Sequence, residues 1–297
     1  MDWRGRPTAI CEVMRLALEK SILSDITFRV GSEAEEFKAH RLILALASPV
    51  FEAMFYGGLA EKGEKIDIPD ISPEGFRCLL RYIYTANASF KNASDPFDTY
   101  IAADKYCIPC LKELSEHFAS RSQITVKNVW IFLKHSLILD MNVVTERCLV
   151  YLKKCTDNAL KDSSFLEASS EAIERILISD SLEAKELTLL KSIVRWAENQ
   201  VSSSETASKK EYLDPLIRHI RFGVLDVESF CSFLDEESNI LSDSDAIAIR
   251  KHLIDPQTCS LPDWCCSKKK RTTYVDQKPK TYLPSLASPK RRSNYRV

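Results

Sequence analysis

Apolar and polar residues alternate in short runs in the first part of the chain. Ile26, Phe28 and Val30 alternate with polar neighbours, which predicts a strand with one buried face. A glycine-containing turn and a second short run at 36–39 follow, so the pattern predicts a β-hairpin. Residues 66–68 predict one more short strand.

Helical spacing of apolar residues begins directly after the hairpin. Residues 40–47 form a compact apolar segment. Ser48 followed by Pro49 has the pattern of a capped helix start, because serine accepts a backbone N–H and proline needs no partner at the first helical position. Ser72 and Pro73 repeat this start before another apolar helical pattern. The first part of the chain is therefore predicted to combine a small sheet with several helices.

The remainder of the chain has the pattern of an all-helical domain. Six of the seven glycines lie before residue 76, and only Gly223 lies beyond it, so few turns there depend on glycine. Apolar residues recur at helical spacing through 131–152. Further helices are predicted at 169–178, 186–200, 212–218, 226–234 and 243–253.

Composition places the chain among soluble globular proteins with room for about two domains. It has 297 residues, of which 28% are charged and 45% hydrophobic. No uncharged apolar run approaches about 18 residues, and the N-terminus lacks the apolar core of a secretory signal. Ten cysteines without such a signal predict reduced thiols. We therefore expect the protein in the cytoplasm, with the nucleus as a second compartment.

The end of the chain differs from the rest in charge. From residue 256 onward there are ten Lys or Arg against two Asp, which leaves residues 1–255 with a net charge of −9. Apolar periodicity disappears, so we predict a disordered basic tail over 256–297. Its basic clusters at 268–271 and 290–292 allow a nuclear localisation signal, a nucleic-acid contact or a merely solvated tail. Cys265-Cys266 allow a lipidated pair or, as we favour, two incidental thiols.

The order of several dispersed motifs resembles a BTB (POZ) domain. The motifs are Asp25-Ile26-Thr27-Phe28-Arg29-Val30, Phe37-Lys38-Ala39-His40-Arg41, Ser48-Pro49-Val50-Phe51, Met54-Phe55 and Leu80-Arg81-Tyr82-Ile83-Tyr84. The resemblance implies an α+β domain that dimerises and docks partners and that has no catalytic apparatus.

The helical part resembles the BACK domain that follows BTB in one group of ubiquitin-ligase adaptors. The motifs behind this resemblance are Val194-Arg195-Trp196-Ala197-Glu198 and Ile220-Arg221-Phe222. Over about residues 15–255 the chain resembles the BTB-BACK-PHR family, whose pattern is visible in Phe55–Glu61 and Ala103–Leu111. Members of that family usually continue into a β-sandwich PHR domain, for which the final segment is too short. The predicted organisation is a BTB domain over 1–121, an all-α BACK domain over 122–255 and the tail.

The resemblance implies a cullin-binding loop after the Phe-x-x-Met-Phe helix. Cullin-binding BTB domains carry there a hydrophobic residue, any residue and then Glu, and Leu59-Ala60-Glu61 falls at that place. A small apolar anchor beside a carboxylate suits a groove on a partner helix. We assign Leu59, Glu61 and the nearby Tyr56 to cullin binding. The alternative is a surface loop in which Leu and Glu occur by chance.

The resemblance also implies a dimer interface near the N-terminus. Asp25 and Arg41 match positions that form a charged pair beside the interface of BTB dimers, although they also fit a pair of ordinary surface charges. An apolar helical stripe precedes them, and in related proteins this helix packs across the partner protomer. The residues of the stripe that we assign to the interface are Ile10, Val13, Met14 and Leu18.

No residue pattern indicates an enzyme, a cofactor or a metal site. Two residues separate Cys107 from Cys110, but no second Cys or His pair lies nearby to complete a four-ligand set. The five histidines do not cluster with Asp, Glu or Cys, and His40 lies in an Ala-His-Arg motif where a structural role is expected. The sequence contains no phosphate loop, dinucleotide fingerprint or nucleophile elbow.

The sequence therefore predicts a non-catalytic, homodimeric substrate adaptor of a cullin-3 RING ubiquitin ligase. The expected partners are cullin-3, a second copy or a related BTB protein, and an unidentified protein substrate. No small-molecule ligand, membrane or nucleic acid is expected as a partner. The alternatives are a nuclear BTB factor that recruits corepressors and a non-degradative scaffold or competitor that dimerises with full-length relatives.

Overall fold

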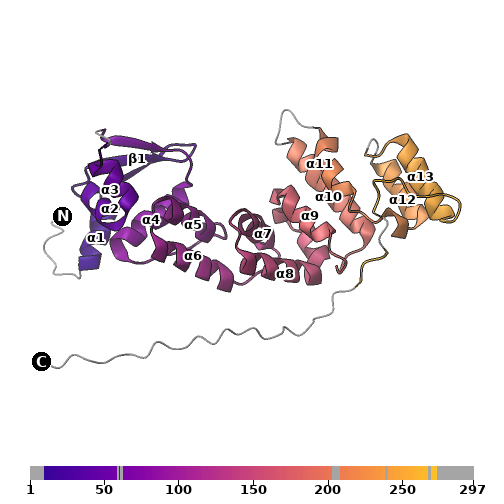
Figure 1. Ribbon diagram of the computed structural model, residues 1–297, viewed down its shortest axis with the longest axis horizontal. Helices are drawn as coiled ribbons and strands as arrows, with labels where there is room; N and C mark the ends of the chain where they lie inside the picture. Colours follow the sequence, from indigo (N-terminus) through magenta and orange to yellow (C-terminus); the bar gives the residue numbers. More distant parts are fainter. Residues whose placement is uncertain are drawn as a thin grey trace, which may run out of the picture.

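The protein folds as a small sheet with its helices at one end, followed by a row of packed helices (Figure 1). The computed structural model describes residues 10–58, 60, 63–202, 208–237, 240–266 and 269–272. The expected fold class, α+β with a small sheet followed by an all-helical part, is confirmed.

The described sheet has three strands in the order β2-β1-β3. β1 (Ile26–Val30) pairs antiparallel with β2 (Glu35–Ala39) and parallel with β3 (Lys65–Ile68). Buried and solvent-facing side chains alternate along β1 and β3, as the sequence pattern predicts. Phe28 of β1 packs among aromatic rings, and the ring of Phe76 lies edge-on at 5.1 Å. The sheet is therefore held to its helices by an aromatic core.

Within the described residues, six helices accompany the sheet. They are α1 (Ile10–Glu19), α2 (Arg41–Ala47), α3 (Pro49–Tyr56), α4 (Pro73–Thr85), α5 (Asp95–Lys105) and α6 (Pro109–Arg121). Both predicted capped starts are confirmed, because the hydroxyls of Ser48 and Ser72 accept backbone N–H groups of α3 and α4. Pro49 and Pro73 follow at the start of these helices.

The second half of the described chain is built from helices. They are α7 (Val129–Ile138), α8 (Asn142–Lys161), α9 (Ser170–Leu177), α10 (Glu186–Ser202), α11 (Lys209–Ile217), α12 (Val227–Glu236) and α13 (Asp243–Ile254), with short 3-10 turns η1 (Ser163–Glu167) and η2 (Phe222–Val224). Two buried indoles cross-link them: Trp130 donates to the Ala159 carbonyl and Trp196 to the Ala168 carbonyl, each at 2.9 Å. In the part of the chain that the structure describes, no helix combines the length and hydrophobicity needed to cross a membrane.

The two halves share one apolar core at their junction. Phe97 of α5 is fully buried and packs edge-on against Phe132 of α7, with ring centres 5.0 Å apart. The ring of His135 stacks on Phe97 at 5.1 Å, and burial lowers the pKa of this histidine, so the ring is neutral at physiological pH. From α8, Arg147 donates to the Ser122 carbonyl at 2.8 Å. The junction is therefore a packed contact and not a free linker.

The tail prediction requires a correction at its beginning. Residues 256–266 and 269–272 are placed with the folded chain, whereas the sequence pattern predicted disorder from residue 256 onward. Trp264 packs edge-on against Phe222 at 5.8 Å, and Cys265 and Arg271 are buried. Isolated buried or half-buried residues in a polar segment produce no periodic apolar pattern. The sequence therefore did not indicate that Trp264, Cys265 and Arg271 pack against the folded chain. The rest of the predicted tail lies outside the described residues.

We expect Ser48→Ala to lower the free energy of unfolding by about 2–4 kcal/mol. The substitution removes the α3 cap, and it leaves the Tyr106 carbonyl without the buried Ser48 hydroxyl that donates to it at 2.6 Å. Urea denaturation followed by circular dichroism measures the change. Ser242→Ala is the matched control, because Ser242 caps α13 at an exposed site and its loss should cost only about 1 kcal/mol. Equal losses in the two variants would contradict the role of the Tyr106 contact.

Candidate interaction surfaces

Large apolar side chains stand in solvent on α1 and α2. Ile10 is 72% exposed, Leu42 61% and Leu46 80%. Leu42 and Leu46 are four residues apart, so they lie on one face of α2. The imidazole Nε2 of His40 lies 2.7 Å from the Ile22 carbonyl oxygen, which holds the start of α2 beside the turn after α1. Exposed apolar residues that share one face of a helix, such as Leu42 and Leu46, are typical of a surface that binds another protein.

The interface residues predicted on α1 divide between core and solvent. Met14 and Leu18 pack against the core of the first half, Val13 is half-buried and Ile10 is exposed. The chain therefore uses part of the stripe for its own folding and leaves the beginning of α1 uncovered. The assignment of these residues to a dimer interface stays a prediction.

Asp25 and Arg41, the charged pair assigned to the same interface, meet at the start of α2. The Asp25 carboxylate accepts the backbone N–H of Arg41 at 2.8 Å. Asp25 therefore supplies a cap that the side chain of the N-cap residue His40 does not provide. The Arg41 guanidinium donates to the Gly63 carbonyl at 2.6 Å and lies 5.1 Å from the centre of the Phe55 ring. The structure brings the pair together through the backbone of α2, and its role in a dimer stays a prediction.

His40 is fully hydrogen-bonded behind this surface. Its backbone N–H donates to the Tyr84 hydroxyl at 2.9 Å, and its Nδ1 lies 2.7 Å from the same oxygen. Since the Ile22 carbonyl can only accept, the neutral ring carries its proton on Nε2, and Nδ1 accepts the Tyr84 O–H. The arrangement ties α4 to the start of α2 and to the turn after α1. It fits the structural role expected for His40.

The loop assigned to cullin binding begins where α3 ends. Tyr56 is exposed in the last turn of α3. The chain leaves the helix at Gly57, where a β-carbon would lie only 2.4 Å from the Ala53 carbonyl oxygen. Any larger residue at position 57 would therefore displace the loop. Leu59 and Glu61 lie outside the described residues.

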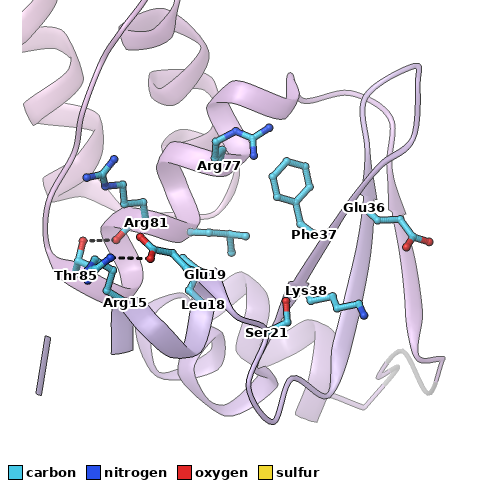
Figure 2. A pocket seen from close by; sticks show the side chains of 11 residues that line it. Arg15, Leu18, Glu19, Ser21, Glu36, Phe37, Lys38, Arg77, Arg81 and Thr85 are labelled. Atoms are coloured by element: carbon cyan, nitrogen blue, oxygen red, sulfur yellow. Dashed lines mark hydrogen bonds and ion pairs between the residues drawn. The ribbon is translucent and has the colours of Figure 1, made fainter. Parts of the chain in front are cut away.

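A cavity of about 380 Å³ opens between α1, β2 and α4 (Figure 2). Arg15 and Glu19 form an ion pair at its edge, with 2.7 Å between Nη1 and Oε2. The Arg77 guanidinium lies 5.0 Å from the centre of the Phe37 ring. The described residues that line the cavity include neither Cys nor His. The cavity is thus lined by paired charges and apolar side chains.

The cysteines singled out from the sequence lie in different surroundings. Cys107 and Cys110 are exposed at the start of α6, whereas Cys265 is buried, and burial raises the pKa of its thiol to about 12. The thiolate of Cys265 is therefore scarce at neutral pH, which disfavours the lipidation alternative at this residue. Over the described ranges, no group of three or more His, Cys, Asp and Glu side chains is placed to hold a metal ion.

Family comparison assigns both halves of the structure. Residues 14–123 match the family model of the BTB/POZ domain, and residues 129–235 match that of BACK, described as BTB And C-terminal Kelch. The chain carries a BTB domain followed by a BACK domain. This confirms the resemblance inferred from the motifs. Domains of these two kinds are non-catalytic protein-interaction modules.

Curated relatives align with the same two domains. Human BTB/POZ domain-containing protein 3 is 29% identical over 237 residues, which cover 78% of this chain and 45% of the relative. Mouse BTB/POZ domain-containing protein 6 is 28% identical over 237 residues, which cover 78% of this chain and 44% of the relative. The Xenopus tropicalis protein 6 is 29% identical with the same two coverages. The chain thus spans less than half the length of these relatives.

The sequence analysis missed one buried charged cluster in the second half of the structure. The Arg271 guanidinium lies 3.0 Å from the Glu186 carboxylate, and their side chains are only 2% and 5% exposed. The buried Arg221 lies beside them. The sequence singles out Arg221 in the Ile220-Arg221-Phe222 motif and Arg271 in the basic cluster at 268–271, but it singles out Glu186 in no motif. Arg271 follows three lysines in a run that resembles a solvated cluster, and no local signal indicates that it meets Glu186.

We expect Tyr84→Phe to lower the free energy of unfolding by about 1–3 kcal/mol. The substitution removes the hydroxyl that accepts from the His40 backbone and donates to its ring, so two partly buried groups lose their partner. Urea denaturation measures the loss. Tyr82→Phe is the control on the same helix, and it should change stability by no more than about 0.5 kcal/mol. An unchanged unfolding midpoint for Tyr84→Phe would show that this hydrogen-bonded chain contributes nothing.

Proposed function

We propose that the chain is a homodimeric substrate adaptor of a cullin-3 RING ubiquitin ligase, acting in the cytoplasm and also in the nucleus. The observation that carries the proposal is a BTB domain joined to a BACK domain through a shared core. BTB-BACK units in general bind cullin-3. An adaptor of this kind positions a protein substrate and contributes no chemistry of its own.

The exposed apolar residues of α1 and α2 support the dimer. A lone chain leaves Ile10, Leu42 and Leu46 in water, whereas a twofold interface would bury the same residues from both copies. Full burial of one leucine side chain contributes about 1.5–3 kcal/mol. A dimer also holds a substrate with two binding segments more tightly, because the second contact becomes intramolecular.

The proposed cullin contact combines the loop after α3 with the first BACK helices, over about residues 126–151. Tyr56 stands exposed at the base of the loop, and Ile138 and Val143 are exposed on either side of the turn between α7 and α8. In this proposal, Leu59 is the apolar anchor of the loop and Glu61 its polar neighbour. The packed junction around Phe97 would fix the BTB domain, with the end of α3, relative to the BACK helices.

The alternative of a nuclear corepressor-recruiting factor depends on the basic clusters. Arg271 belongs to the first cluster, yet its side chain is buried in the BACK domain. The cluster therefore cannot act as a free linear signal while Arg271 is seated. A non-degradative scaffold or competitor would use the same dimer surface. Ubiquitination of a bound substrate by the reconstituted ligase would distinguish the adaptor from that scaffold.

We expect Leu46→Glu to convert the dimer into a monomer without unfolding it. The glutamate would place a charge in an apolar interface, whereas in a lone chain the position is 80% exposed and tolerates the change. Light scattering coupled to gel filtration at micromolar concentration gives the mass. Ile254→Glu is the matched control, because Ile254 is 64% exposed on α13 and its substitution should leave the dimer intact. A wild-type chain with the mass of a monomer would refute the dimer.

We expect Leu59→Asp to weaken binding to the N-terminal domain of cullin-3 by about 2–4 kcal/mol, and Glu61→Ala by about 1–2 kcal/mol. The aspartate would place a charge in a dry groove, whereas the alanine removes a hydrogen bond near the rim. Calorimetry resolves both, because a tenfold change in affinity is about 1.4 kcal/mol. The dimer mass and thermal stability of both variants should match those of the wild type. Unchanged affinity in an intact Leu59→Asp dimer would overturn the adaptor proposal.

A further inference from the structure

The end of the described chain lies on the BACK domain as a short extended segment. Residues 269–272 run beside residues 180–182 and form a parallel β-bridge with them. The Thr272 N–H donates to the Asp180 carbonyl at 2.9 Å, and the Leu182 N–H donates to the Thr272 carbonyl at 3.1 Å. These bonds involve only main-chain atoms, so they place no requirement on the side chains of the segment.

Arg271 is the deeply buried residue of this segment, and all five N–H groups of its guanidinium meet acceptors. Nε and Nη2 donate to the two carboxylate oxygens of Glu186, each at 3.0 Å. Nη2 also donates to the His219 carbonyl at 3.1 Å, and Nη1 donates to the carbonyls of Leu177 and Ser179. A lysine ammonium has three donors on one atom and cannot reach acceptors spread around a plane. We call these four partners the arginine socket.

The arginine socket carries a negative charge that needs a cation. The Glu186 side chain is almost completely buried, and its Oε1 also accepts the backbone N–H of Arg221 at 2.8 Å. Without Arg271, the carboxylate would face three carbonyl oxygens and would lose the guanidinium that pairs with it. Such an uncompensated buried charge is unfavourable. The socket therefore favours occupation by a guanidinium group.

Arg221 holds the main chain of the same segment. Its Nη1 donates to the Lys269 carbonyl at 2.6 Å, and its Nη2 donates to the Asp180 carboxylate at 2.5 Å. Its Nε is buried without a hydrogen-bond partner among the residues that the structure describes. The described residues 269–272 therefore leave this buried donor unsatisfied, which makes them an imperfect occupant.

We propose that the arginine socket and residues 180–182 form a binding site for an extended, arginine-containing peptide segment of a partner protein, and that residues 269–272 occupy it in cis as an exchangeable ligand. Main-chain pairing with one anchored side chain is the way strand-addition sites accept different sequences. Lys269, Lys270 and Thr272 are exposed, so their side chains impose little selection. The tethered segment has a high effective concentration and so keeps weak ligands out. This site is independent of the proposed cullin contact.

The test uses the full chain with Arg271→Ala, which empties the arginine socket, and a labelled octapeptide with the sequence of residues 268–275. Fluorescence anisotropy should show at least about tenfold tighter binding to the variant than to the wild-type chain, in which the tethered segment competes. The matched control peptide has lysine in place of the arginine and therefore the same net charge. It should bind the variant at least about tenfold more weakly than the arginine peptide.

Two results of this experiment count against the site. Equal binding of the arginine and lysine peptides would mean that only charge attracts them, and equal binding to variant and wild type would place the contact elsewhere on the chain. Either result overturns the proposal.

A second variant keeps the test decisive where Arg271→Ala does not fold. A protease recognition sequence inserted between Ser267 and Lys268 allows the segment to be cut after the full chain has folded. The cut segment should remain bound, and an excess of the arginine peptide should displace it, whereas the lysine peptide should not. Loss of the segment on cutting without rebinding would refute the site. Retention against excess arginine peptide would refute the exchange.

Discussion

The packing of Phe97 between the BTB and BACK domains is the contact on which the arrangement of the whole chain depends. Phe97 belongs to α5, yet it lies in the apolar core of the BACK domain. Its edge-on contact with Phe132 and its stacking on the neutral ring of His135 join the two domains through packed side chains. The exposed residues of α1 and α2, the end of α3 and the arginine socket consequently belong to two domains that are packed against each other.

Much of the fold could be predicted because its signals act over a few residues. The alternation in 26–30 and the serine–proline pairs at 48–49 and 72–73 specify a strand and two helix starts, and the structure contains all three. The helix predicted at 169–178 spans Ser170–Leu177. Periodicity indicates that a helix has an apolar stripe, but it does not indicate which residues of the stripe pack in the core and which remain exposed. For that reason the division of α1 between core and solvent became visible only in the structure.

The candidate surfaces were predictable where they coincide with a motif, and not elsewhere. The assignment of Tyr56 and of the loop after it to a binding surface rests on several dispersed motifs that occur in a recognisable order. Glu186 opens α10, where carboxylates are ordinarily favoured by the helix dipole and solvated, and Arg271 follows three lysines. Their contact joins residues 85 positions apart, and one sequence contains no pattern for such a pairing. A buried ion pair contributes little to stability. The Glu186 carboxylate nevertheless restricts which side chain can occupy the site of Arg271.

The shared core also affects how the protein unfolds. Because Phe97 sits on a BTB helix and completes the BACK core, loss of structure in either domain exposes apolar surface of the other. The two domains should therefore melt as one cooperative unit and not in succession. A substitution that destabilises the BACK helices should therefore also lower the fraction of molecules in which the BTB domain is folded. The cellular abundance of the protein becomes sensitive to changes far from any partner contact.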